Sequence, residues 1–167
     1  MALQSTKDRI QQEFDKKYKE YAAHDRTLSA LAAFRFVLES IPEINQETVF
    51  WSFRPRVCSP GSESNPRTPD GLIVQRPPHS FVLELKTSWN KDDVTQVTGY
   101  GNAEGYLQAD GAQTRFSKFP ANKCILLGYQ NVPGDSNLEF LFDEWERQKP
   151  PASLVVFRYS LETAPHR

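Results

Sequence analysis

Residues 68–89 read TPDGLIVQRPPHSFVLELKTSW, and this stretch decides the fold. Two short apolar runs lie in it, GLIVQ at 71–75 and SFVLELKTS at 80–88, and the turn-forming residues RPPH at 76–79 join them. Apolar runs of this length with a short proline-containing connection predict two β-strands paired as a hairpin. The chemistry of the chain is expected at the ends of these two strands.

Two acidic residues and a lysine occupy those ends. A β-strand turns successive side chains to opposite faces, so Glu84 and Lys86 project from the same face. The hairpin partner brings Asp70, which opens the first run, next to Glu84. Two carboxylates at close range repel each other, and a hard cation with oxygen ligands removes that cost. The alternatives are a simple Asp-Gly turn at residue 70 and a solvated edge strand that carries Glu84 and Lys86.

The pattern therefore predicts a metal site with Mg²⁺ or Mn²⁺ as the cofactor. Asp70 and Glu84 are the expected ligands, and the backbone carbonyl of Leu85, between Glu84 and Lys86, is a further oxygen ligand. Lys86 is expected to be the charged partner of a bound phosphate and of the attacking water. If its pKa falls near the metal, it can also serve as a general base.

Pro69-Asp70 followed by Glu84-Leu85-Lys86 resembles the signature of the PD-(D/E)XK nuclease superfamily. The resemblance implies a restriction-endonuclease-like fold with the core order α-β-β-β-α-β, and residues 25–130 can be read in that order. Gln96 and Tyr100 are similar to the Gln-x-x-x-Tyr helix motif of the RecB-like and exonuclease-like branch. Residues four apart share one helix face. The resemblance implies that Gln96 and Tyr100 support the site and hold the nucleic acid.

Members of this superfamily often place another metal ligand on the first core helix. Glu39 is the best-placed residue for this role, and Glu43 and Glu47 are its rivals. Some cap-snatching endonucleases of segmented RNA viruses use a histidine on an early helix, and His24 would take that part in an RNA-cleaving alternative.

Basic residues near the hairpin are candidates for contacts with phosphate groups. The first group consists of Arg54, Arg56, Arg67 and Arg76, and the second of Lys91, Arg115, Lys118 and Lys123. Alternation places Arg54 and Arg56 on one strand face. The net charge is -1, with 20 basic and 21 acidic residues, so the basic excess common in nucleic-acid-binding proteins is absent. Ordinary surface charge is therefore the alternative for these residues.

The remaining periodicity predicts an α/β fold in which helices flank a central mixed sheet, in the order α-α-β-β-β-α-β-α-β. The expected helices are 5–22, 25–40, 92–108 and 136–148, and the expected strands are 47–57, 71–75, 80–88, 123–129 and 153–161. Residues 58–68 and 109–122 are expected to be loops. The chain of 167 residues predicts one domain over 1–167, with an N-terminal helical extension at 1–24, the core at 25–130, and a C-terminal helix and strand at 131–167.

Composition narrows the class of protein further. The two cysteines, Cys58 and Cys124, form no CxxC pair, so neither a disulfide framework nor a zinc site is expected. The N-terminus lacks the apolar core of a signal peptide, and the apolar run LSALAAFRFVL is short and broken by Arg35. These features predict an intracellular protein, in the cytoplasm or nucleus, that is neither secreted nor bound to a membrane.

Together these observations predict a metal-dependent nuclease that hydrolyses phosphodiester bonds, with DNA favoured over RNA as the partner. The first alternative is a cap-snatching-like RNA endonuclease. The second is a non-catalytic nucleic-acid-binding or assembly module on the same fold. A homodimer is expected by analogy, because many nucleases of this type pair two active sites to cut two strands.

Overall fold

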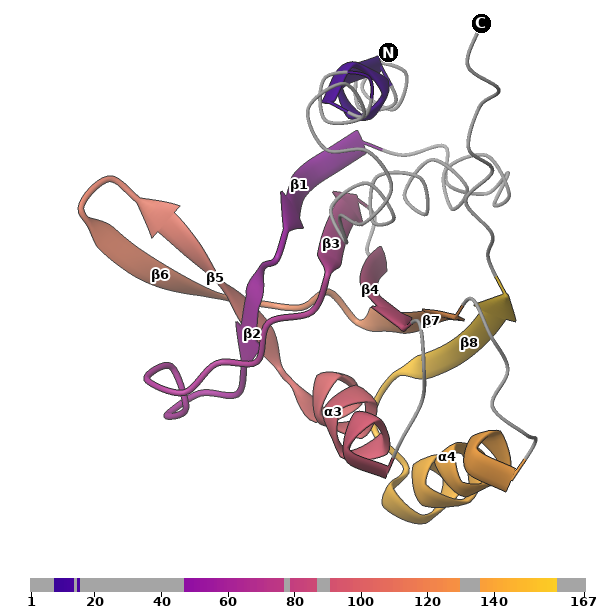
Figure 1. The fold of residues 1–167 in the computed structure, drawn as a ribbon. Coiled ribbons are helices and arrows are strands. Elements are labelled where there is room, and N and C mark those ends of the chain that lie inside the picture. The colour runs from indigo at the N-terminus through magenta and orange to yellow at the C-terminus, as the bar shows by residue number, and fades with distance from the viewer. Residues whose placement is uncertain are drawn as a thin grey trace, which may run out of the picture.

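The structure is a computed structural model that describes residues 8–13, 15, 47–76, 79–86, 91–129 and 136–158 (Figure 1). Residues 8–13 and 15 are helical, within the helix expected over 5–22. The helix expected over 25–40 lies outside the described residues. The other elements follow in chain order: β1 Glu47–Phe53, β2 Arg56–Cys58, β3 Gly71–Arg76, β4 His79–Lys86, α3 Lys91–Asn102, β5 Gly105–Asp110, β6 Gln113–Lys118, β7 Asn122–Tyr129, α4 Ser136–Gln148 and β8 Ser153–Arg158.

The central sheet is mixed, as the sequence predicts. Its strand order is β1-β3-β4-β7-β8, with antiparallel pairing from β1 to β4 and parallel pairing from β4 to β8. The predicted hairpin is confirmed, because β3 and β4 pair antiparallel with Gly71 opposite Leu83. β4 is the central strand, and it is buried on both faces after its first residue, His79. The alternative of a solvated edge strand carrying Glu84 and Lys86 is therefore wrong.

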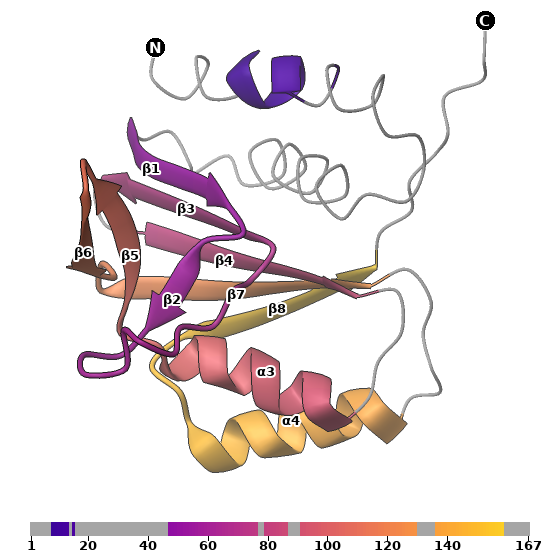
Figure 2. The same cartoon turned by 60° about the vertical axis from the view of Figure 1, so that its left-hand side comes forward.

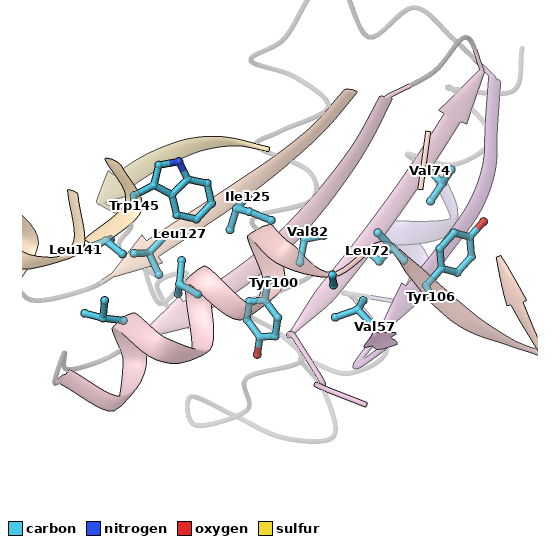
Figure 3. Close-up of a cluster of buried hydrophobic side chains, with 13 residues drawn as sticks. Val57, Leu72, Val74, Val82, Tyr100, Tyr106, Ile125, Leu127, Leu141 and Trp145 are labelled. Carbon is cyan, nitrogen blue, oxygen red and sulfur yellow. The ribbon is translucent and has the colours of Figure 1, made fainter. Parts of the chain in front are cut away.

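Helices α3 and α4 cover one face of this sheet, and the helical segment at 8–13 lies on the opposite side (Figure 2). Apolar side chains of α3, α4 and the central strands form the core between the helices and the sheet, including Val82, Tyr100, Leu127 and Trp145 (Figure 3). Val82 belongs to the same β4 face as Glu84 and Lys86. The two charged residues therefore continue the row of side chains that faces α3.

A second, three-stranded sheet of order β2-β5-β6 was not expected. The predicted helix over 92–108 ends at Asn102, and the predicted loop over 109–122 contains most of the β5–β6 hairpin, which projects from the body of the molecule (Figure 1). The hairpin turns at Gly111, whose φ of 60° is unfavourable for residues with a Cβ atom. Gly105 lies against the backbone carbonyl of Ser117 with no room for a Cβ atom.

The strand expected over 47–57 is likewise two strands. Arg54 has a φ of 49° and separates β1 from β2, and its N–H donates to the carbonyl of Asp70 at 3.0 Å. The prediction that Arg54 and Arg56 share one strand face is therefore wrong. In the part of the chain that the structure describes, no helix has both the length and the apolar character needed to cross a membrane.

Candidate active site

Asp70 and Glu84 meet at one end of the β3–β4 hairpin. Because Gly71 pairs with Leu83, the register places Asp70 opposite Glu84, one position beyond the last pair. The carboxylate of Asp70 reaches across to β4, where its Oδ2 accepts the N–H of Leu85 at 2.8 Å. Both residues are buried, with exposures of 7% for Asp70 and 1% for Glu84. The structure thus brings together the two acids that the sequence singles out.

Lys86 joins Glu84 to the first turn of α3. Its Nζ lies 2.8 Å from Glu84 Oε1 and 2.9 Å from Asp93 Oδ1, and it donates to Gln96 Oε1 at 2.7 Å. Burial lowers the pKa of Lys86, but the bonds to Glu84 and Asp93 outweigh that effect, so its pKa is raised. Lys86 is therefore an ammonium ion at neutral pH in this arrangement.

Tyr100 and Gln96 complete the network from α3. The Tyr100 hydroxyl donates to Glu84 Oε2 at 3.2 Å and accepts from Gln96 Nε2 at 2.6 Å. Burial raises the pKa of Tyr100, and the negative charges of Glu84 and Asp70 raise it further. The phenol therefore stays protonated and holds one oxygen of Glu84, while Lys86 holds the other. Gln96 and Tyr100 therefore lie beside Lys86 and Glu84, and their role in supporting a catalytic site stays a prediction.

Asp93, in the first turn of α3, is a site residue that is absent from the predicted set. It lies three residues before Gln96 and seven before Tyr100, and these intervals place all three on one face of a helix. This spacing could have identified Asp93 from the sequence, because Gln96 and Tyr100 were already predicted to share a helix face. Asp93 adds a second carboxylate to Lys86 and so fixes the ammonium group between β4 and α3.

The other predicted metal ligands do not join the site in the described part of the chain. Glu39, Glu43 and His24 lie outside the described residues. Glu47 pairs with Arg76, whereas Phe53 pairs with Gly71, so Glu47 lies at the far end of β1, roughly 20 Å away at ~3.4 Å per residue. The carbonyl of Leu85 stays a predicted ligand. Among the described residues, no group of three or more His, Cys, Asp and Glu side chains is placed to hold a metal ion.

The predicted phosphate-binding residues are dispersed. Arg54 and Arg56 are exposed, and Arg56 Nη2 donates to Thr114 Oγ1 of the second sheet at 3.4 Å. Lys91 Nζ lies 5.5 Å from the ring centroid of Phe140 on α4. The side chain of Arg76 lies outside the described residues.

Two of the basic residues contact α3 directly. The guanidinium of Arg67 lies against Gly99. Lys123 is buried under the C-terminal end of α3, so both its predicted phosphate contact and the alternative of ordinary surface charge are wrong. Lys123 is therefore not part of a surface shared with the exposed basic residues among those described.

Comparisons of the chain with protein-family models, with curated proteins and with solved structures gave no match. The chemical interpretation of the site therefore depends only on the contacts between its residues. These are two buried carboxylates on paired strands, an ammonium group bonded to one of them, and a helix whose Asp93, Gln96 and Tyr100 hold that pair in place.

Proposed function

We propose that the protein is a divalent-metal-dependent nuclease that hydrolyses phosphodiester bonds, with DNA as the favoured substrate. The observation that carries this proposal is the buried pair Asp70 and Glu84 with Lys86 bonded to Glu84 on the same strand. The order β1-β3-β4-α3-β7 also fits the β-β-β-α-β part of a restriction-endonuclease-like core. Asp70 and Glu84 lie at one end of the β3–β4 hairpin, where Glu84 contacts Tyr100 of α3.

The donor set fits a hard divalent cation. Mg²⁺ and Mn²⁺ commonly take one or two carboxylates and fill their remaining positions with water and phosphate oxygens. Asp70 and Glu84 would supply the carboxylates, with the carbonyl of Leu85 as a further oxygen. When bound, the ion would polarise the phosphoryl group and lower the pKa of a bound water.

Lys86 would supply positive charge to the site, and residues of α3 would hold its geometry. Lys86 provides a fixed positive charge beside Glu84 for the phosphate, whose negative charge increases during attack. Its raised pKa favours this role over that of a general base. Tyr100 and Gln96 hold Glu84 and Lys86 in one geometry, and Asp93 binds the Lys86 ammonium group with a second carboxylate.

Cleavage assays test the proposal directly. Purified protein should be incubated with single-stranded, double-stranded and branched DNA and with RNA, each in Mg²⁺, in Mn²⁺ and in EDTA. We expect cleavage of at least one DNA substrate that requires the metal and stops in EDTA. Cleavage of RNA alone would favour the RNA endonuclease. Absence of cleavage together with absence of metal binding would favour the non-catalytic module.

Metal binding can be measured without a substrate. Mn²⁺ should raise the melting temperature of the wild-type protein, because a ligand at 100 times its Kd stabilises the folded state by about 2.7 kcal/mol. In Asp70→Asn the amide oxygen can still accept the N–H of Leu85, but the carboxylate is lost. We expect the Mn²⁺ shift to disappear in this variant. Asp110→Asn, at an exposed position of β5, is the control and should keep the shift. A full shift in Asp70→Asn would remove Asp70 from the metal site.

A further inference from the structure

A cavity of about 540 Å³ lies between residues 57–67 and α3, and the active-site proposal makes no use of it. Most of its lining side chains are hydroxyls and amides. They include Ser59, Ser62, Ser64, Asn65, Thr95 and Asn102. Among the described residues that line it, Arg67 is the single cation and none is a carboxylate. Such a lining suits a polar ligand that carries negative charge.

The guanidinium of Arg67 lies directly against the backbone of Gly99. A Cβ atom at position 99 would overlap Arg67 Nε and Cζ, so the absence of a side chain at Gly99 leaves the space that the guanidinium occupies. The backbone of Arg67 is also fixed, since it exchanges two hydrogen bonds with Val57 at 2.8 and 2.9 Å. The cation is therefore held against α3 although its side chain is exposed.

Hydrogen bonds connect the walls of the cavity to one another and to the helices α3 and α4. Ser59 Oγ donates to the carbonyl of Asn102 at 3.5 Å, and Asn102 Nδ2 donates to Gln148 Oε1 of α4 at 3.0 Å. These bonds hold the segment that follows β2 against the end of α3. The cavity thus exists before any ligand binds, which lowers the ordering cost of binding.

The cavity and the candidate active site share α3 as a common wall. Thr95 and Gly99 line the cavity, while Gln96 and Tyr100, each one residue later, bond to Lys86 and Glu84. Arg67 also precedes Asp70 by three residues. A chain of nucleotides that places one phosphate at the acidic pair can therefore reach the cavity with a neighbouring nucleotide.

We infer that this cavity binds one nucleotide of a single-stranded segment next to the cleaved bond, with Arg67 on its phosphate. The inference rests on the proposed nuclease function. The volume falls within the range of small-ligand sites, about 300–1,000 Å³, and so accommodates one unpaired nucleotide. A paired base would have to leave its partner to enter, at a cost of a few kcal/mol. The substrate class is therefore nucleic acid that is single-stranded at the cut.

One nearby charge opposes this binding. Glu63 lies between Ser62 and Ser64, which line the cavity. Its negative charge also adds to the effect of burial in raising the pKa of the Cys58 thiol on the cavity wall. Removing this charge should strengthen the binding of an anion. Glu63→Gln is therefore expected to bind single-stranded DNA about 2-fold more tightly at low salt.

The test is fluorescence anisotropy with a labelled single-stranded DNA oligonucleotide in EDTA, where no cleavage occurs. Arg67→Gln should weaken binding about 5-fold or more, and should reduce the slope of log K against log salt by about 0.7. Gly99→Ala retains every charge but displaces the guanidinium, so it should weaken binding to a similar extent. Arg9→Gln, at an exposed position of the helical segment 8–13 on the opposite side of the sheet from α3, makes the same change in net charge and should have little effect.

Equal losses in Arg67→Gln and Arg9→Gln would overturn the inference, because only general electrostatic attraction would then be at work. Unchanged binding in Gly99→Ala would overturn it as well. Circular dichroism melting checks that both variants fold, and Gly99→Ala should be no less stable, since alanine favours the helix by about 1 kcal/mol. A duplex of the same sequence should bind at least 5-fold more weakly than the single strand.

The same variants separate this inference from the proposed function. If the wild-type protein cuts DNA and the Arg67→Gln and Gly99→Ala variants bind as it does, the cavity assignment fails and the nuclease stands. If nothing is cut in any metal, yet both variants lose binding, the cavity is a single-strand binding site and the proposed nuclease function fails.

Discussion

Replacing Glu84 with glutamine should reduce metal-dependent cleavage by about 1,000-fold and leave the fold intact. The amide oxygen of glutamine can still accept from Tyr100 or Lys86, so the buried network keeps most of its bonds. The negative charge that Glu84 would bring to the metal site is lost, and the loss of one well-placed charge or dipole in an active site commonly costs 100-fold to 1,000-fold. The initial rates of the wild type and of Glu84→Gln should be compared in excess Mn²⁺, on the nucleic-acid substrate that the wild type cleaves fastest.

The matched control is Glu139→Gln, which makes the same charge change on the exposed surface of α4. This variant should cleave at the wild-type rate. Glu84→Ala is also expected to be inactive, but it removes the acceptor Glu84 from Tyr100 and one of the three partners of Lys86, and so loses stability too. If Glu84→Gln cut at the wild-type rate with normal metal dependence, Glu84 would not be a ligand, and the acidic pair would be a structural feature of the sheet.

The core of the candidate site was predictable because its signals are local. A strand alternates its side chains, so Glu84 and Lys86 had to share a face wherever that strand lay. A hairpin connection of a few residues leaves little choice of register, and this brought Asp70 opposite Glu84. Gln96 and Tyr100 share a helix face for the same kind of reason. None of these inferences depends on contacts that are distant in the sequence.

The second sheet was not predictable in this way. Residues 103–108 contain few residues that break a helix apart from Gly105, and their strand conformation is set by pairing with β2 and β6. Glu104 N–H donates to the carbonyl of Cys58 at 3.1 Å, a contact across more than forty residues. Tertiary pairing of this kind overrides local propensity. The positive φ of Arg54, which divides β1 from β2, also has no signal in its residue type.

Lys123 is the clearest case of a residue whose role depends on the fold. Its Nζ donates to three backbone carbonyls at the end of α3, those of Tyr100 at 3.1 Å, Gly101 at 2.7 Å and Ala103. It also lies 5.1 Å from the ring centroid of Phe119. The last carbonyls of a helix have no partner within it and carry partial negative charge. Lys123 therefore caps the helix that supplies Gln96 and Tyr100 to the site.

Replacing Lys123 with methionine should lower the free energy of unfolding by about 2–3 kcal/mol at pH 7. Methionine fills the space of the aliphatic stem, but it offers no donor to the carbonyls, which then lose their hydrogen bonds from Lys123. Urea denaturation gives the measurement, with Lys118→Met, an exposed position on β6, as the control. The control should change stability by no more than about 0.5 kcal/mol. An equally small change in Lys123→Met would show that the cap contributes nothing.

The pH dependence of this difference tests the state of the buried amine. Burial lowers the pKa of Lys123 to about 8, while the charge of Glu104 partly opposes the shift. Between pH 8 and about 10.5 the unfolded chain therefore binds more protons at this residue than the folded chain does, so folding gains stability as the pH rises. A neutral amine still donates two hydrogens to the carbonyls. The stability difference between the wild type and Lys123→Met should thus grow from pH 8 to pH 10. A difference that shrinks over this range would mean that the ammonium form is the one that the fold favours.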